Sequence, residues 1–230
     1  MPDPFHLRPV AAIAGRALLP GDPGRALALA QVVLGDDRRM FNHHRGLWGY
    51  TGTASDGAPL TIQSTGMGGP SAAIVLEELA GLGVSTAVRV GTARAVAPDL
   101  ALGDLVAATA VDAVDGTSRA LGGPQRRDLT GSLALALAAA AGRDGLVASH
   151  DLLYAPDPRA QADAWRAAGV LAADLETGAL AAVAARHGIA FGAVVAIAVD
   201  ARGARLDEER LACAGEAAGR AAAQALGLDG

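Results

Sequence analysis

The sequence predicts an α/β protein: a single-domain, three-layer α/β/α arrangement with a central mixed sheet flanked by helices. Short apolar runs bounded by turn residues alternate along the chain with longer segments whose apolar residues recur at helical spacing. Such alternation is typical of a mostly parallel or mixed sheet covered on both faces. The 230 residues contain no Pro/Ser-rich or charge-dense linker, so we expect one domain over residues 1–230.

Seven apolar runs are predicted strands, and six periodic segments are predicted helices. The predicted strands are Ala17–Leu19, Leu60–Ser64, Thr86–Val90, Asp104–Ala110, Gly145–Ser149, Val170–Asp174 and Ala193–Val199. The predicted helices are Gly24–Val33, Ser71–Leu82, Ser132–Ala141, Pro158–Ala168, Glu176–His187 and Asp207–Ala225. Two of the helices are rich in alanine, which has the highest intrinsic helix propensity.

The segment from Thr61 to Thr92 has the order of an anion-binding turn: a strand end, a glycine-rich loop, a helix and a second strand. The glycines Gly66, Gly68 and Gly69 allow positive φ and close approach of a ligand to the backbone. The following helix is expected to turn Ile74, Val75, Leu79 and Leu82 inward, with Glu77 and Glu78 on the other face. Its N-terminal N–H groups and dipole favour a phosphate or another oxyanion.

Polar and charged residues follow several other predicted strands. Arg25 lies in the turn after the first strand, and Arg89 lies near the exit of another. Glu176 and Asp200 come directly after two later strands. Because the ligand crevice of such folds lies beyond the carboxyl ends of the strands, we expect these side chains to meet in one site.

Charge and composition exclude several classes of function. A formal net charge of -5 argues against a nucleic-acid partner or an anionic membrane surface, because both select basic faces. The five histidines lack metal-ligand spacing and the chain has one cysteine, so we expect no metal and no disulfide within the chain. The first ten residues lack the pattern of a signal peptide, which predicts a cytoplasmic protein.

Six motifs, spread over nearly the whole chain, carry a resemblance to a known family. They are Leu19–Pro23 with Arg25, Arg45–Gly52, Ser64–Ser71, Arg89–Thr92, Asp174–Glu176 and Asp200. In these motifs the sequence resembles the nucleoside phosphorylases of the type shared by bacterial purine nucleoside phosphorylase and uridine phosphorylase. The resemblance implies a partly barrel-like sheet and cleavage of ribonucleosides by inorganic phosphate, which gives a free base and ribose 1-phosphate. Phosphate would be a co-substrate, and no cofactor is expected.

The resemblance also implies a phosphate site. Arg25 and Arg89, with the backbone N–H of Gly21 and the hydroxyl of Thr92, would hold the phosphate, because guanidinium groups match its oxygens. Arg45 occupies the place of an arginine that the family supplies from a neighbouring subunit. We therefore expect a homo-oligomer, at least a dimer, with a hexamer built from dimers that share active sites as the usual form of the family.

The ribose site that the resemblance implies rests on four residues. Glu176 matches the ribose-binding glutamate, Leu175 stands beside it, Met67 would line the sugar, and His6 would reach the 5′ side from the partner subunit. Three of them have a plain structural alternative. Glu176 could interact with a helix dipole, Met67 could fill a gap in the core, and His6 could belong to a disordered tail.

For the base, Asp200 stands where the purine enzymes carry the general acid that protonates the leaving purine. Arg210 is the best match for the arginine that assists it, although Arg202 or Arg205 could substitute. Uridine phosphorylases carry a Gln-x-Arg pair instead, and no such pair follows Tyr154. The expected substrates are therefore purine nucleosides.

The predicted base pocket departs from the family pattern. It comprises Ala93, Arg94, Leu153 and Tyr154, in which Arg94 replaces a glycine and Leu153 replaces a stacking phenylalanine. Arg94 could block a purine, select a base with an extra acceptor, or point to solvent. Next to the ribose glutamate, Leu175 replaces a methionine.

Three alternative functions stay open. One is uridine phosphorylase activity, a second is a nucleosidase that uses water, and the third is a weakened homologue that only binds nucleosides. The set of Arg25, Arg45 and Arg89 argues against a nucleosidase, because a hydrolase has no need of a threefold phosphate clamp.

Overall fold

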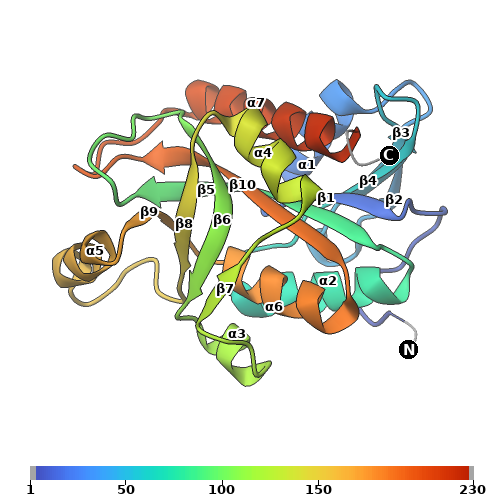
Figure 1. Ribbon diagram of the computed structural model, residues 1–230. Coiled ribbons are helices and arrows are strands. Elements are labelled where there is room, and N and C mark those ends of the chain that lie inside the picture. The colour runs from blue at the N-terminus through green and yellow to red at the C-terminus, as the bar shows by residue number, and fades with distance from the viewer. Residues whose placement is uncertain (1–3, 228–230) are drawn as a thin grey trace.

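The computed structural model describes residues 4–227, over which the chain forms a ten-stranded sheet flanked by helices (Figure 1). The strands are β1 (Arg16–Pro20), β2 (Arg39–Asn42), β3 (Gly49–Thr53), β4 (Pro59–Gln63), β5 (Thr86–Ala95), β6 (Leu105–Ala113), β7 (Arg126–Asp128), β8 (Asp144–Ser149), β9 (Val170–Asp174) and β10 (Ala190–Val199). The α-helices are α1 (Pro23–Val33), α2 (Gly69–Gly81), α3 (Gly116–Ala120), α4 (Ser132–Ala141), α5 (Pro158–Ala167), α6 (Thr177–His187) and α7 (Glu208–Gly227). A 3₁₀ turn covers His44–Gly46.

The sheet is mixed and partly closed, as predicted. Strand β5 pairs in parallel with β1 and β10 and antiparallel with β9. Because β10 continues through β6 and β8 back to β9, the strands β5, β10, β6, β8 and β9 form a closed ring. Strands β1, β4, β3 and β2 extend the sheet from β5, which therefore lies at the junction of the ring and the open part.

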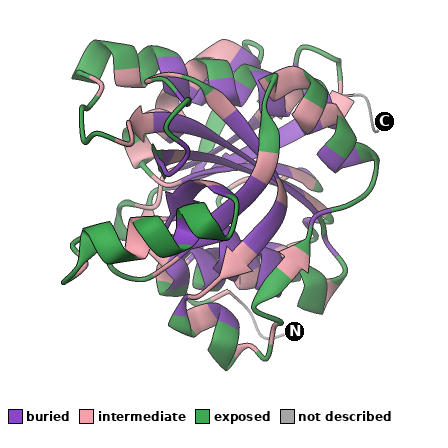
Figure 2. Ribbon diagram, turned by 60° about the vertical axis from the view of Figure 1, so that its left-hand side comes forward, coloured by how far each residue is buried: buried purple, intermediate pink, exposed green. Residues whose placement is uncertain are grey.

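Helices cover both faces of the sheet, which gives three layers (Figure 1). Helices α1, α4 and α7 pack on one face, where Leu29 and Leu137 belong to a buried cluster. Helices α2 and α6 pack together on the other face, where Leu76 and Leu180 belong to a second cluster. Figure 2 shows buried strands between helices whose outer sides are exposed. A small third cluster contains Trp165 of α5, which packs near β9.

All seven predicted strands and six predicted helices are present, most with shifted ends, and β9 and α4 have the predicted bounds. The chain also contains β2, β3, β7 and the short helix α3, none of which the sequence predicted. Strands β2 and β3 have the sequences RMFN and GYTGT, which lack an apolar run. They form because β3 pairs with β4 and β2 then pairs with β3, so their partners lie outside the local sequence.

One face of α2 was predicted incorrectly. Val75 and Leu79 are buried as expected, but Ile74 is 43% exposed. The buried stripe includes Leu76 instead of Ile74. On the opposite side, Glu78 accepts hydrogen bonds from the backbone N–H groups of residues 5–7, and so fixes the start of the described chain against α2.

Over residues 4–227, no helix has both the length and the apolar character that crossing a membrane requires. The cytoplasmic location stays a prediction.

The core of the α1/α4/α7 face gives a stability prediction with a matched control on one helix. Leu137 of α4 is fully packed against β10, where a side chain at Gly192 would come within 2.3 Å of it. Leu135 on the same helix is 73% exposed. We expect Leu137→Ala to lower the free energy of unfolding by about 2–5 kcal/mol through lost burial and a residual cavity. Leu135→Ala should have little effect. Denaturant unfolding measures both variants, and equal losses would contradict this placement of the core.

Candidate active site

A cavity of about 690 Å³ opens at the ends of several strands, where the sequence predicted a ligand site. Eleven of the predicted site residues line it: Gly21, Arg25, Met67, Arg89, Thr92, Ala93, Arg94, Leu153, Tyr154, Leu175 and Glu176. They come from the loops that follow β1 and β4, from the first turn of α1, from β5, and from the segments that follow β8 and β9. Residues far apart in the sequence are thus brought into one space.

Arg89 lies at the centre of this site, inside the structure, with only 2% of its surface exposed. Its Nε donates to the Asp174 carboxylate at 2.7 Å, and its Nη2 donates to Glu176. A Cβ at Gly91 would lie 2.8 Å from the guanidinium, so only glycine leaves room for the arginine here. Burial alone would lower the pKa of Arg89, but the attraction of Glu176 and Asp174 outweighs it and raises the pKa above its ordinary value.

Asp174 also organises the start of α6. Its carboxylate accepts hydrogen bonds from the backbone N–H and the hydroxyl of Thr177, at 3.2 and 2.6 Å. Its Oδ1 also accepts a bond from the Glu176 N–H at 3.3 Å. These bonds fix the first turn of α6 and place the side chain of Glu176, the residue before the helix, beside Arg89.

The N-terminus of α2 already holds an anion, which is the carboxylate of Glu176. The backbone N–H of Gly68, the residue that caps this helix, donates to Glu176 Oε1 at 2.7 Å. Gly66 and Gly68 have φ values of 74° and 82°, as the prediction of positive φ requires. One N–H of this helix start is thus taken by a carboxylate of the chain itself, and an external oxyanion at the remaining N–H groups stays a prediction.

Two arginines at the cavity have donors without acceptors among residues 4–227. Nη1 of Arg89 is buried and has no hydrogen-bond partner. Arg25 is half-buried in the first turn of α1, which Asp22 caps by accepting the Arg25 N–H at 2.8 Å, and its guanidinium forms neither a hydrogen bond nor an ion pair in that range. Burial, with a smaller contribution from Arg89, lowers the pKa of Arg25. Unfilled guanidinium donors near each other provide what an oxyanion needs.

Thr92 and Gly21 line the same cavity as these arginines, so the four residues of the predicted phosphate site share one space. Met67, between the two positive-φ glycines, is 89% exposed and also lines the cavity. It is therefore not a gap-filling core residue.

The outer part of the cavity contains Arg94, Leu153 and Tyr154, all exposed, with Leu153 and Tyr154 at 68% and 85%. Arg94 lines the cavity and is also exposed, so its role stays a prediction. The segment from the end of β8 through α5 thus forms part of the cavity wall, and several of its lining residues are apolar, among them Leu153 and Trp165.

Sequence reasoning missed three residues of that wall: His150, Gln161 and Trp165. The His150 and Trp165 rings lie 4.9 Å apart. Burial lowers the pKa of His150 below its ordinary value, although Asp174 and Asp151 act to raise it. Signals for them existed: His150 directly follows a strand, and Gln161 and Trp165 are four residues apart, on one face of a helix.

Four predicted site residues do not line the cavity of this chain: His6, Arg45, Asp200 and Arg210. Arg45 is exposed in the 3₁₀ turn and has a φ of 59°. His6 is held by Glu78, as described above, and so is not a loose tail. Asp200 directly follows Val199 of the lining, but its Oδ1 accepts backbone bonds from its own turn. Arg205 lines the cavity where Arg210 does not. The roles of these four stay predictions.

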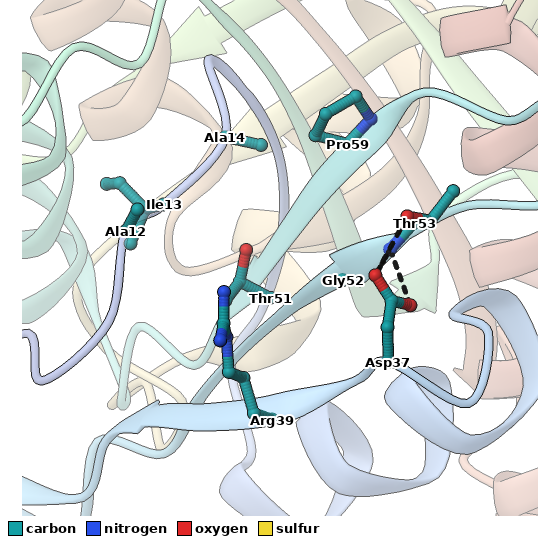
Figure 3. Close-up of a pocket in the computed structure, with 9 residues that line it drawn as sticks. All are labelled: Ala12, Ile13, Ala14, Asp37, Arg39, Thr51, Gly52, Thr53 and Pro59. Atoms are coloured by element: carbon teal, nitrogen blue, oxygen red, sulfur yellow. Dashed lines mark hydrogen bonds between the residues drawn. The ribbon is translucent and has the colours of Figure 1, made fainter.

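A second cavity of about 310 Å³ lies between residues 12–14 and strands β2 and β3 (Figure 3). Its acid, Asp37, accepts bonds from the backbone N–H and the hydroxyl of Thr53, at 3.0 and 2.8 Å. These bonds hold the pKa of Asp37 below its ordinary value. The Asp37 carboxylate thus binds the edge of β3, which gives this acid of the cavity a structural role. Over residues 4–227, no three His, Cys, Asp or Glu side chains gather as a metal site would require.

Comparison with known proteins agrees with the geometry. Residues 16–228 match the family model of the phosphorylase superfamily. The chain belongs to this superfamily. It is 34% identical over 205 residues to the guanosine phosphorylase of Halorubrum lacusprofundi, covering 84% of this chain and 83% of the relative. It is 32% identical over 204 residues to the uridine phosphorylase of Escherichia coli, covering 80% and 79%.

A solved structure of uridine phosphorylase from Vibrio fischeri superposes on this phosphorylase with a TM-score of 0.85 over 93% of this chain and 91% of the other. At 24% identity this likeness shows the fold alone. Family and relatives together show that the protein is an enzyme of the nucleoside phosphorylase type, a pentosyltransferase.

The buried ion pairs of this phosphorylase give a testable stability difference. Asp174→Asn removes one of the two charges that compensate buried Arg89, and we expect a loss of about 3 kcal/mol in the free energy of unfolding. Asp163→Asn breaks a pair with Arg166 in which both side chains are well exposed, so its loss should be much smaller. Denaturant unfolding at neutral pH compares them. Similar losses would show that Arg89 does not depend on Asp174.

Proposed function

We propose that the protein catalyses phosphate-dependent cleavage of purine ribonucleosides to free base and ribose 1-phosphate. The observation that carries this proposal is that Arg25 and Arg89 line one cavity together with Glu176. Each arginine has N–H donors without a hydrogen-bond partner in the described residues. The relative named guanosine phosphorylase supports a purine substrate.

Phosphate would bind to the guanidinium groups of Arg25 and Arg89, the N–H of Gly21 and the hydroxyl of Thr92. Charge-assisted bonds of this kind are about twice as strong as neutral ones, and the apolar surroundings strengthen them further. The bound phosphate is both the nucleophile and the counter-charge for the positive sugar carbon that develops as the glycosidic bond breaks.

Ribose would lie between Met67, Leu175 and Glu176. Ribose hydroxyls donate hydrogen bonds, and a carboxylate accepts up to four, so Glu176 can hold the sugar while it keeps its bonds to Arg89 and Gly68. Glu176 would thereby connect the sugar to the phosphate-binding arginine. Tyr154 and Leu153 would cover the base.

Asp200 would protonate the departing purine, with assistance from Arg210 or from Arg205, which lines the cavity. One oxygen of Asp200 is engaged by the backbone of its own turn, and the other has no hydrogen-bond partner in the part of the chain described. That oxygen is the one available to carry a proton toward the base.

Arg45 and His6 would act in the site of a neighbouring subunit. Both lie outside the cavity of their own chain, and Arg45 is exposed. Arg45 would give the phosphate a third guanidinium and His6 would contact the 5′ side of the ribose. This arrangement requires at least a dimer, and we propose a hexamer built from such dimers.

Uridine phosphorylase activity is the second candidate. The relative named uridine phosphorylase supports it, and so does the position of Asp200 outside the cavity lining, because a pyrimidine needs no acid at a purine nitrogen.

Base release by the purified protein from inosine, guanosine, adenosine and uridine, each with and without inorganic phosphate, tests the proposal. We expect release from purine nucleosides only when phosphate is present. In Arg25→Met the KM for phosphate should rise about 10- to 100-fold, because a charged hydrogen bond contributes about 1.5–3 kcal/mol. The exposed Arg38→Met serves as the control. Release without phosphate would indicate a nucleosidase. Phosphate-dependent release from uridine alone would indicate a uridine phosphorylase, and the absence of any release would indicate a binding protein.

The role of Asp200 has a conservative test. Asp200→Asn keeps an oxygen that can accept the backbone bonds of Arg202 and Ala204 but cannot deliver a proton. We expect kcat for purine nucleosides to fall about 100-fold or more, as loss of a general acid does, while nucleoside binding is kept. Asp207→Asn is the matched control, since Asp207 also accepts a backbone bond in this segment and does not line the cavity. An unchanged kcat in Asp200→Asn would remove the acid from the mechanism.

A further inference from the structure

The backbone register places two arginines of the cavity lining on either side of Val199. Val199 of β10 pairs with Arg94 of β5, and on its other side it forms an isolated bridge with Arg205. All three residues line the cavity. Because neighbouring strands lie about 4.8 Å apart, the two arginine backbones are separated by about 10 Å.

Neither arginine is neutralised within residues 4–227. Both are exposed, and neither Arg94 nor Arg205 forms an ion pair or a side-chain hydrogen bond there. Asp200, the acid next to Val199, directs one oxygen to its own turn and does not line the cavity. The acids that do line it include Asp174 and Glu176, which Arg89 already engages.

This part of the cavity therefore presents many donors and few acceptors. A guanidinium has five N–H donors and no acceptor, and it cannot lose its charge near neutral pH. The cavity lining also includes the polar His150, Gln161 and Tyr154 and the apolar Leu153 and Trp165. A base that enters the cavity therefore meets arginine donors and apolar side chains in its lining.

The chemistry of the bases then decides which of them fits. Hypoxanthine, guanine and xanthine carry a carbonyl oxygen at the position where adenine carries an amino group, and uracil differs from cytosine in the same way. A guanidinium donates well to a carbonyl oxygen, whereas an amino group presents further donors to the guanidinium's own donors. Carbonyl oxygens also gain negative charge as the base departs, which the two cations stabilise.

We propose that Arg94 and Arg205 make the enzyme selective for nucleosides whose base carries a carbonyl oxygen, over nucleosides whose base carries an amino group at the same position. The inference rests on the proposed function for its reaction, and it adds the substrate class and the residues that select it. Arg94 is then a residue that determines specificity and does not block the purine.

The test compares kcat/KM for inosine and adenosine at saturating phosphate. We expect inosine to be preferred about tenfold or more, and Arg94→Met and Arg205→Met each to reduce that preference about tenfold, mainly through a lower kcat/KM for inosine. Arg220→Met removes an exposed arginine of α7 that does not line the cavity, so it should leave the ratio unchanged. A preference for adenosine, or a ratio that neither cavity variant changes, overturns the inference.

Calorimetric titration with free hypoxanthine and free adenine separates this inference from the reaction, because it requires no turnover. Preferential binding of hypoxanthine that is lost in Arg94→Met or Arg205→Met supports the inference even when no nucleoside is cleaved. Turnover of purine nucleosides with equal binding of the two bases supports the reaction and overturns the selectivity.

Discussion

The site depends on one buried cation. A guanidinium inside a protein loses its hydration, and it is stable there only when carboxylates surround it. Arg89 meets this requirement with Asp174 and Glu176, which lie 85 and 87 residues away in the sequence. Because Asp174 also accepts bonds from Thr177 at the start of α6 and Glu176 also accepts from Gly68 at the start of α2, the cation fixes two helix starts relative to β5 and β9. The glycine at position 91 is required by the volume of the same side chain.

Charge is distributed unevenly over this acidic protein. The chain has a net charge of -5, yet four arginines and three acids line the main cavity, and two of those acids are committed to Arg89. Local fields in a cleft, not the net charge, decide which ligands enter. The inner arginines have the arrangement that an oxyanion needs, while Arg94 and Arg205 give the outer part a separate cationic character. One cavity thus contains two pairs of arginines in different surroundings.

Parts of the site could be predicted because their signals are local. The glycines at 66 and 68 have positive φ because a tight turn must connect a strand to a helix there, and Asp22 and Pro23 begin α1 so that Arg25 lies in its first turn. The family motifs, taken in their order along the chain, predicted eleven residues that line one cavity in the structure. The wall that runs from the end of β8 through α5 was missed because His150, Gln161 and Trp165 belong to no family motif, and packing of α5 near β9 brings the last two to the site.

The sequence by itself determined the alternation of strands and helices, the three-layer fold and the residues that follow the strands, because periodicity and turn chemistry are properties of short segments. Only the tertiary structure decided which of these residues bind one another. It paired Arg89 with Glu176, turned one oxygen of Asp200 to its own backbone, and set Arg94 beside Arg205 across Val199. The physical reason is that a hydrogen-bond partner is chosen by strand register and burial, which join positions that the sequence keeps far apart.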